Sequence, residues 1–441
     1  MKFYAIGGFK EVGKNMTAIE VNGEVVIFDM GVSMEHLIEL SGRGLNYEDL
    51  DEQKLRELGV LPNDLILNTK KVIAIAISHG HLDHISAIPK LIRRYNCPIL
   101  ATPYTAEIIR RLLKDHRMED YLKYVTPMQY GDTADLSQNF KIEYVNMTHS
   151  IPDASLIAAY TADGLVTVGF DYKLDNTPTL GNKPDYRRLK ELGNEGIKLH
   201  LSECVHISDE QRCPSEKVAK DMVFDAIDRA YLDSSAVFIT SFASHIARIK
   251  SIVEANKGRR EIIILGRSME NYLEAASTLG LIDTSKFTLA GRPKTVKSNI
   301  ENRIMKNPEK YLVLSTGNQG EPNSVLSRIT NKEYRYNFRK EDQVIFSSTV
   351  IPTPINKANR YVIERNMKEQ GVRILKDVHV SGHAMKEDHR DLLRILNPEK
   401  IIPVHGETER LASFASLCEE EGFIIGDTVH IMTDGRYVNI K

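Results

Sequence analysis

The stretch of sequence richest in reactive side chains is residues 78–84 (SHGHLDH), which follows the apolar run VIAIAI. A strand ending before this stretch and a tight turn within it would point His79 and His81 the same way, while Asp83 and His84 project from the next turn. Imidazole nitrogens and carboxylate oxygens suit zinc or manganese, and the lack of a thiolate leaves positions for water, as catalytic sites require. A polar surface loop is the competing interpretation, but such a cluster of histidines rarely arises by accident. The spacing therefore predicts a metal site that can serve two ions.

Three further donors occur where strand-like runs end, namely His149, Asp171 and His405. Taken alone, His149 and Asp171 are as compatible with a hydrogen-bonding role at a strand end as with a role as metal ligands. The histidine loop favours the ligand role, because a two-ion centre needs such additional donors. Two divalent ions can polarise a phosphoryl oxygen, activate water and stabilise a leaving oxygen, which is hydrolysis chemistry. The predicted ligands are His79, His81, His149 and Asp171 for one ion, and Asp83, His84, Asp171 and His405 for the other, with Asp171 bridging.

Composition bounds the class of protein. The 441 residues are many for one core, so two domains are expected. Hydrophobic residues make up 42% and charged residues 27%, an ordinary globular composition, and the net charge of -2 offers no general basic excess for binding phosphate. The scattered cysteines form no C-x-x-C pair, which indicates structural thiols in a reducing compartment. No run approaches the ~18 apolar residues of a membrane span, so a cytoplasmic protein without membrane contact is expected.

The elements that must position these donors fall into two patterns. Short strand-like runs up to about residue 172, with a helical pattern at 85–95 and a polar, partly helical excursion at 34–68, predict a mixed α/β domain. From about residue 206 strands alternate with helices, the last of them starting near Lys357, which predicts a parallel, doubly wound sheet. Strands at 378–383 (VHVSGH) and 400–407 (KIIPVHGE) then resume the first domain. The predicted domain segments are 1–205, 206–374 and 375–441, with the middle one inserted.

At these motifs the sequence resembles a known family. SHGHLDH, followed by His149 and Asp171, resembles the metallo-β-lactamase superfamily, whose fold is an αββα sandwich, and the insertion resembles the β-CASP domain of its nucleic-acid-processing branch. The stretches GRSMENYLEAASTLG, STGNQGEPNSVLSRI, VIFSSTVIPTPINKANRYVI and HVSGHAMKEDHRDLLRILNPEKIIPVHGE are similar to the ribonuclease J family. The resemblance covers nearly the entire chain.

The resemblance implies a metal-dependent ribonuclease with 5′ to 3′ exonuclease activity that favours 5′-monophosphate ends, often with endonuclease activity as well. Zinc is the expected ion, with manganese as an alternative, and the expected partners are single-stranded RNA and a second copy of the chain. Carried over by motif, Asp29 would orient the histidine loop, Glu203 would do the same ahead of the insertion, and His383 would contact the scissile phosphate. A histidine at 405 favours RNA, because branches that cut DNA tend to carry an apolar residue there. The expected catalytic residues are Asp83, Asp171 and His383.

Other residues are candidates for reading the RNA or its 5′ phosphate. Ser244 lies where it could cap the following helix, and helix N-termini bind phosphate readily. Arg267 is a candidate for the 5′-phosphate pocket, and Gln319 is a candidate for contact with RNA. The competing interpretations are a plain cap for Ser244, a structural ion pair for Arg267 and a loop-stabilising amide for Gln319. The remaining candidates form one loop and are Ser381, Gly382, His383 and Ala384.

The sequence also departs from the bacterial pattern of the family. Glu203 stands where bacterial relatives usually carry Asp, and His245 replaces a common Asn. The excursion at 34–68 does not match well, and the bacterial C-terminal extension that helps dimerisation has no counterpart. A compact, archaeal-type form is the better resemblance.

Three other functions are compatible with parts of this pattern. A thioesterase or lactonase of the same superfamily explains the metals but not the long insertion between Asp171 and His405. A flavodiiron-like oxidoreductase would carry a carboxylate at the position of His81 and a flavin domain. A catalytically silent RNA-binding scaffold normally shows lost ligands, whereas all the ligand positions are filled here.

Overall fold

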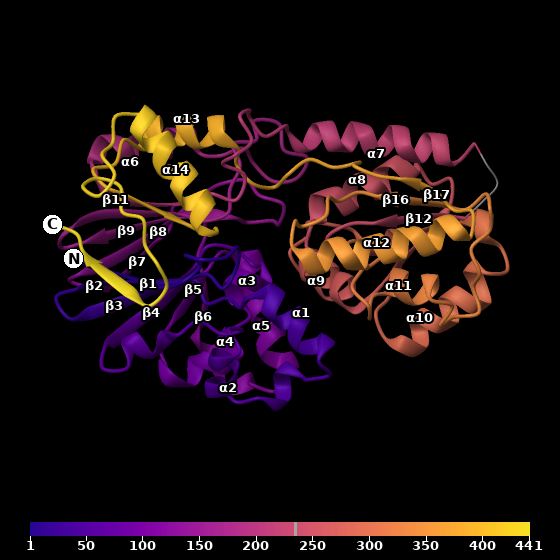
Figure 1. The fold of residues 1–441 in the computed structure, drawn as a ribbon, viewed down its shortest axis with the longest axis horizontal. Helices are drawn as coiled ribbons and strands as arrows, with labels where there is room; N and C mark the ends of the chain where they lie inside the picture. Colours follow the sequence, from indigo (N-terminus) through magenta and orange to yellow (C-terminus); the bar gives the residue numbers. More distant parts are fainter. Residues whose placement is uncertain (233–235) are drawn as a thin grey trace. The chain divides into compact units, whose positions relative to one another are not determined.

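The computed structural model describes residues 1–232 and 236–441, and Figure 1 shows their fold. Contacts between Cα atoms divide the chain into two compact units. The first unit comprises Met1–Asn176, Asn182–Cys213 and Gly382–Lys441, and the second comprises Thr177–Gly181 and Pro214–Ser381. The domain boundaries expected after residues 205 and 374 stay predictions.

The first unit is built around two sheets with a shared core. The cluster that joins them includes Phe28 from one sheet and Tyr144, Ile157 and Leu201 from the other, all fully buried. One sheet has the order β19-β1-β2-β3-β4-β5-β6 and the other β18-β11-β10-β9-β8-β7. The strands of the first sheet are β1 (Lys2–Gly7), β2 (Met16–Val21), β3 (Glu24–Phe28), β4 (Lys71–Ile77), β5 (Ile99–Ala101), β6 (Val125–Pro127) and β19 (Arg436–Asn439). Those of the second are β7 (Thr133–Ser137), β8 (Phe140–Asn146), β9 (Ser155–Thr161), β10 (Gly164–Gly169), β11 (Ile197–Glu203) and β18 (Ile401–Val404).

Helices cover the outer faces of both sheets. Figure 1 shows α1 to α5 on one side of this unit and α6, α13 and α14 on the other. Leu189 and Leu192 of α6 and Leu392 of α13 pack in one apolar cluster with β8, β9 and β11, which fixes these helices against the second sheet. The order of layers is the predicted αββα sandwich. The helices are α1 (Met34–Gly42), α2 (Glu52–Glu57), α3 (Leu82–Ile85), α4 (Ile88–Leu91), α5 (Pro103–Asp115), α6 (Tyr186–Glu195), α13 (Lys386–Leu396) and α14 (Thr408–Glu420).

The second unit holds a wholly parallel sheet, as the alternation of strands and helices predicts. Its described strands have the order β14-β13-β15-β12-β16-β17, and every neighbouring pair is parallel. The strands are β12 (Val237–Thr240), β13 (Glu261–Leu265), β14 (Thr288–Ala290), β15 (Tyr311–Ser315), β16 (Gln343–Phe346) and β17 (Arg373–Leu375). The helices are α7 (Glu216–Ala230), α8 (Ile246–Asn256), α9 (Arg267–Thr278), α10 (Pro293–Asn299), α11 (Val325–Thr330) and α12 (Pro354–Glu369).

Two predicted elements differ from the structure. The helix expected at 85–95 is broken into α3, α4 and a short 3-10 turn, because Pro89 in the first turn of α4 has no backbone N–H to donate to the preceding turn. The strand expected at 378–383 does not form. Within that stretch the carbonyl of Val378 accepts hydrogen bonds from the side chains of Arg248 and Ser347, and its backbone nitrogen donates to the carbonyl of Phe346 at the end of β16.

No helix in the described part of the chain combines the length and the apolar character that crossing a membrane needs.

Candidate metal centre

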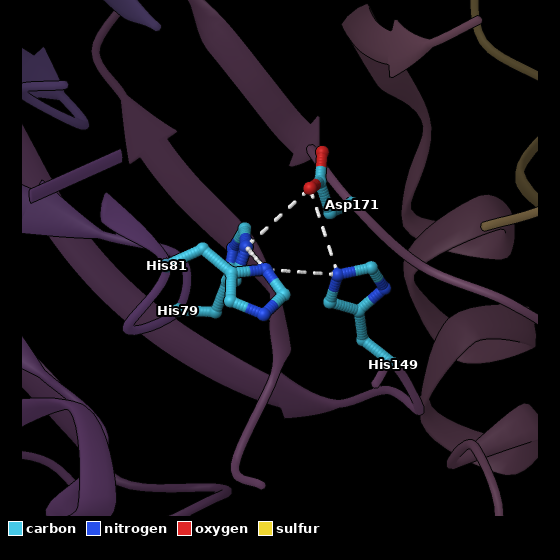
Figure 2. Close-up of side chains that lie close together, drawn as sticks. All are labelled: His79, His81, His149 and Asp171. Atoms are coloured by element: carbon cyan, nitrogen blue, oxygen red, sulfur yellow. Dashed lines mark hydrogen bonds and ion pairs between the residues drawn. The ribbon is translucent and has the colours of Figure 1, made fainter. Parts of the chain in front are cut away.

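The predicted donors meet at strand ends in the first unit. The loop 78–84 follows β4, Asp171 follows β10, and His405 follows β18 directly. His149 comes shortly after β8, where Thr148 Oγ1 donates to the carbonyl of Lys173 and ties this segment to the one that carries Asp171. Figure 2 shows side chains from these separate segments converging on one point.

The first group of donors surrounds one carboxylate oxygen. Asp171 Oδ2 lies 3.4 Å from His79 Nε2 and 3.6 Å from His149 Nε2. His81 Nδ1 lies 3.1 Å from the Nε2 atoms of both His79 and His149 (Figure 2). The four ligand atoms all lie within 4.8 Å of one another, a spacing that suits a single cation.

The second group shares Asp171 with the first. His84 Nε2 lies 3.4 Å from Asp171 Oδ2 and 3.6 Å from Asp83 Oδ2. His405 Nε2 lies 3.3 Å from Asp171 Oδ1 and 3.8 Å from Asp83 Oδ2. The structure thus brings together both predicted sets of donors, with the carboxylate of Asp171 between them. Their role as ligands stays a prediction.

The chemistry of these donors fits divalent cations. Asp171 Oδ1 is buried and accepts no hydrogen bond, although it lies beside an imidazole nitrogen, so an acceptor is left for a cation. Burial, reinforced by neighbouring histidines, holds the pKa of His81 and of His149 well below its usual value, which keeps these rings neutral. Burial would raise the pKa of Asp171, but the His405 and His84 rings outweigh it and hold this pKa well below its usual value. His81 and His149 thus have the neutral form that metal ligands require, whereas the carboxylates of Asp171, Asp83 and Asp29 outweigh burial and raise the pKa of His84 well above its usual value.

Asp29 fixes the histidine loop from behind. Its carboxylate accepts hydrogen bonds from the backbone nitrogen and the hydroxyl of Ser78, each at 2.7 Å, and lies 2.6 Å from His84 Nδ1. A bond at Nδ1 leaves His84 Nε2 facing the second group of donors. Asp29 has φ 58°, in the left-handed region where aspartate and asparagine are better tolerated than most residues. The orienting role expected for Asp29 stays a prediction, which these contacts support.

A second carboxylate lies on the other side of the cluster. His383 Nδ1 is 3.1 Å from Glu203 Oε1, while His383 Nε2 lies 3.9 Å from Asp171 Oδ2. Burial favours the neutral ring, but the carboxylates of Glu203 and Asp171 raise the pKa of His383 to about 9. His383 thus directs Nδ1 toward Glu203 and Nε2 toward Asp171.

Family comparisons agree with this architecture. Three family models match the chain, described as "Metallo-beta-lactamase superfamily" over residues 10–156, "Ribonuclease J, beta-CASP domain" over 234–365 and "Zn-dependent metallo-hydrolase RNA specificity domain" over 371–432. Ribonuclease J of Pyrococcus abyssi is 43% identical and covers 100% of this chain and 97% of its own length. Ribonuclease J of Methanocaldococcus jannaschii is 41% identical, with coverages of 100% and 99%.

The chain belongs to the ribonuclease J family. This confirms the resemblance drawn from the motifs, and with it the metallo-β-lactamase sandwich and the β-CASP domain. A crystal structure of a protein of unknown function from Enterococcus faecalis V583 aligns with a TM-score of 0.65 at 16% identity and covers 99% of both chains. That likeness shows the fold alone. Membership in the superfamily implies divalent metal ions, consistent with the donor groups of the first unit.

Sequence reasoning missed Asn15, which links two histidines of the second donor group, His84 and His405. Its amide oxygen lies 2.8 Å from His405 Nδ1, and its amide nitrogen lies 3.0 Å from His84 Nε2. The backbone nitrogen of Asn15 also donates to the carbonyl of Asp83. Asn15 is 2% exposed in the structure. In the sequence, its one signal is its place in the stretch GKNM, directly before the strand-like run MTAIEV.

The candidate RNA-reading residues divide between the two units. Ser381 lies at the end of the second unit, while Gly382 and Ala384 lie in the first. The carbonyl of Gly382 is 2.7 Å from His149 Nδ1 and so directs His149 Nε2 toward Asp171, and the amide of Ala384 donates to the carbonyl of Tyr172. Gly382 is required, because a Cβ there would lie 2.7 Å from the Cβ of Ser150.

The other candidates lie in the second unit with structural partners, and their contacts with RNA stay predictions. The N-cap of α8 is His245, not Ser244, and its Nδ1 accepts the amide of Arg248. Arg267 Nη1 lies 3.3 Å from Glu270 Oε2, which is the ion pair of the competing interpretation. Gln319 donates to the carbonyl of Thr349 and accepts the amide of Ile351, and it therefore stabilises its loop.

Proposed function

We propose that this chain is a metal-dependent ribonuclease that hydrolyses phosphodiester bonds in single-stranded RNA, proceeding 5′ to 3′ from 5′-monophosphate ends. The observation that supports it best is the pair of donor groups that share Asp171. Membership in the ribonuclease J family and the match to an RNA specificity domain support RNA as the substrate. Endonucleolytic cleavage is a second mode that the assay below separates from the first.

The residues of the cluster would have different roles in such a reaction. His79, His81 and His149 with Asp171 would hold one divalent ion, and Asp83, His84 and His405 with Asp171 the other. Bound ions would supply Lewis acidity that polarises a phosphoryl oxygen and activates water. Zinc is the proposed ion and manganese the alternative, because nitrogen-rich sites with carboxylates accept both.

His383 is the proposed acid of this reaction. Glu203 holds its Nδ1, so the protonated Nε2 can donate a hydrogen bond to a phosphate oxygen or a proton to the leaving oxygen. Against burial, the carboxylates of Glu203 and Asp171 favour the protonated ring and raise the pKa of His383 to about 9. Asp83 is only partly buried, and its carboxylate can accept a proton from water at the edge of the cluster.

The test compares RNA substrates that differ only at the ends. Zinc-loaded and manganese-loaded proteins receive RNA carrying a 5′-monophosphate or a 5′-triphosphate, labelled at the 5′ or the 3′ end. We expect 5′-labelled mononucleotides and faster decay of the monophosphate RNA. Internal fragments would show the endonuclease mode, and equal rates for both ends would contradict the 5′-phosphate preference.

A matched pair of histidine variants tests the metal mechanism. His81→Ala removes a donor from the first group, so cleavage should fall below detection while circular dichroism shows a native fold. His430→Ala changes a histidine outside the cluster and should cleave normally. Full activity of His81→Ala, or of protein stripped by a chelator, would contradict the mechanism. The cytoplasmic location and the homodimer stay predictions, and light scattering after size-exclusion chromatography tests the dimer.

A further inference from the structure

A pocket of about 470 Å³ opens in the second unit at the carboxyl ends of β13, β14 and β15. Ligands of parallel α/β sheets usually bind at this edge, and the volume falls within the range of small-ligand sites. None of the predicted metal ligands contributes to it. The lining includes three arginines and three apolar or aromatic residues, namely Arg267, Arg292, Arg328, Val296, Val325 and Tyr334.

The charge of the pocket is positive. Arg292 is exposed and forms no ion pair with any described residue. Arg267 pairs with Glu270 at 3.3 Å, and Arg328 pairs with Glu333 at 2.8 Å. The two carboxylates offset two of the guanidinium groups, and the unpaired Arg292 leaves a net positive charge that suits one anionic group.

Glu270, an acidic residue beside this positively charged pocket, has a structural role. Its Oε1 accepts the backbone nitrogen of Gly291 at 3.0 Å, which ties α9 to the loop after β14. A Cβ at Gly291 would lie 2.2 Å from Glu270 Oε2, and a Cβ at Gly266 would lie 2.5 Å from the Thr316 methyl group. Glycine at positions 266 and 291 therefore lets the loops after β13, β14 and β15 approach one another around the pocket. The Glu270 carboxylate holds α9 to the loop after β14.

The rest of the lining is apolar and aromatic. Val296 and Val325 are buried, and Tyr334 is 4% exposed with Arg328 5.0 Å from the centre of its ring. The hydroxyl of Tyr334 is buried and has no hydrogen-bond partner. Because buried polar groups are nearly always paired, this hydroxyl points to a polar group that the protein itself does not supply. An apolar floor, an aromatic ring and an arginine rim together suit a heterocyclic base that carries a phosphate.

This pocket is distinct from the loop that carries Ser244. Ser244 follows β12, and β14 lies three strands away in the sheet order. At a spacing of about 4.8 Å per strand, the loops after β12 and β14 begin roughly 14 Å apart. Arg292, which follows β14, therefore cannot bind the same phosphate group as Ser244.

We propose that the pocket binds a nucleotide, with its phosphate at Arg292 and Arg328 and its base against Val296, Val325 and Tyr334. The inference rests on the proposed function in one respect, since the nucleotide is taken to be one residue of the RNA substrate. A free mononucleotide has the same chemistry, and the experiment distinguishes the two sources.

Photocrosslinking of the full-length, zinc-loaded protein tests the proposal. The probes are 8-azidoadenosine 5′-monophosphate and a short phosphorothioate RNA with one internal 4-thiouridine. Peptide mass spectrometry should find the RNA crosslink within residues 323–334. Arg292→Glu and Arg328→Gln should each lower its yield roughly tenfold, as expected for the loss of one hydrogen bond to a charged group. Arg365→Glu is the matched control, because it changes an exposed arginine of α12 in the same unit and should leave the yield unchanged.

The possible results are decisive. Absence of crosslinks at 323–334 with both probes, or an equal yield from Arg292→Glu, would overturn the proposal. Crosslinking by the mononucleotide alone would overturn the assignment to RNA and establish a free-nucleotide site. The same crosslink in His81→Ala, which should not cleave RNA, separates the pocket from the proposed catalysis.

Discussion

Asp29 Oδ2 lies 2.6 Å from His84 Nδ1, and neither side chain is exposed to solvent. The same carboxylate also receives the backbone nitrogen and hydroxyl of Ser78. The Asp29 carboxylate thus contacts both a predicted ligand and the loop that carries three others.

Asp29→Asn should weaken metal binding by about 10- to 100-fold, the usual effect of removing a carboxylate that orients a ligand histidine. Asparagine keeps the shape and accepts the left-handed backbone of residue 29, so the variant isolates the charge. Competition with a chromogenic chelator measures the affinity. Asp377→Asn, at an exposed position with φ 61°, is the control. Equal affinities in all three proteins would rule out the orienting role.

Removal of metal should lower the melting temperature of the first unit. A ligand at 100 times its dissociation constant stabilises the native state by about 2.7 kcal/mol, and apo protein lacks this contribution. Calorimetry in chelator and in zinc measures the difference. His81→Ala should show a smaller gap between the two melts than the unmodified chain, and identical gaps would argue against His81 as a ligand.

Arg248→Met should destabilise the second unit by about 3 kcal/mol, the lower end of the range for a broken buried pair, because the buried Glu216 carboxylate loses the guanidinium but keeps its contact with His245 Nε2 at 3.5 Å. Arg248 is fully buried, and its guanidinium donates to both oxygens of Glu216 at 2.6 and 2.8 Å. Urea unfolding measures the loss, and Arg248→Met combined with Glu216→Gln should recover part of it. Arg365→Met, which removes only a surface pair, should change the stability by less than about 1 kcal/mol. If the double variant recovers no stability, the loss in Arg248→Met does not come from the broken pair of Arg248 with Glu216.

His200 should make the chain less stable as the pH falls. Burial lowers the pKa of His200 to about 3, whereas the unfolded chain has a histidine pKa of about 6.5. Between these values the unfolded state binds a proton that the folded state does not, so the free energy of unfolding falls by about 1.4 kcal/mol per pH unit. From pH 6.5 to 5, the native chain should lose roughly 2 kcal/mol more than His200→Gln in urea unfolding. Parallel losses would show that another group dominates.

Local patterns in the sequence predict the loop 78–84, the alternation of the second unit and the donors at strand ends, because each depends on neighbours along the chain. Two other features depend on tertiary contacts, and a third depends on a local hydrogen bond of a side chain. Asn15 acts through His84 and His405, which are remote in sequence. The stretch 378–383, expected as a strand, instead accepts hydrogen bonds at the carbonyl of Val378 from the side chains of Arg248 and Ser347. The N-cap of α8 is His245, not Ser244, because its imidazole reaches the amide of Arg248.

The position of His405 along the chain has a consequence for synthesis. The four donors of the first group precede residue 172, whereas the second group is completed only by His405 after the whole second unit. A ribosome that makes the chain from its N-terminus releases the last donor near the end of translation. The carbonyl that orients His149 of the first group belongs to Gly382, which also follows the second unit. A nascent chain therefore lacks part of both predicted ion sites until its synthesis is nearly finished.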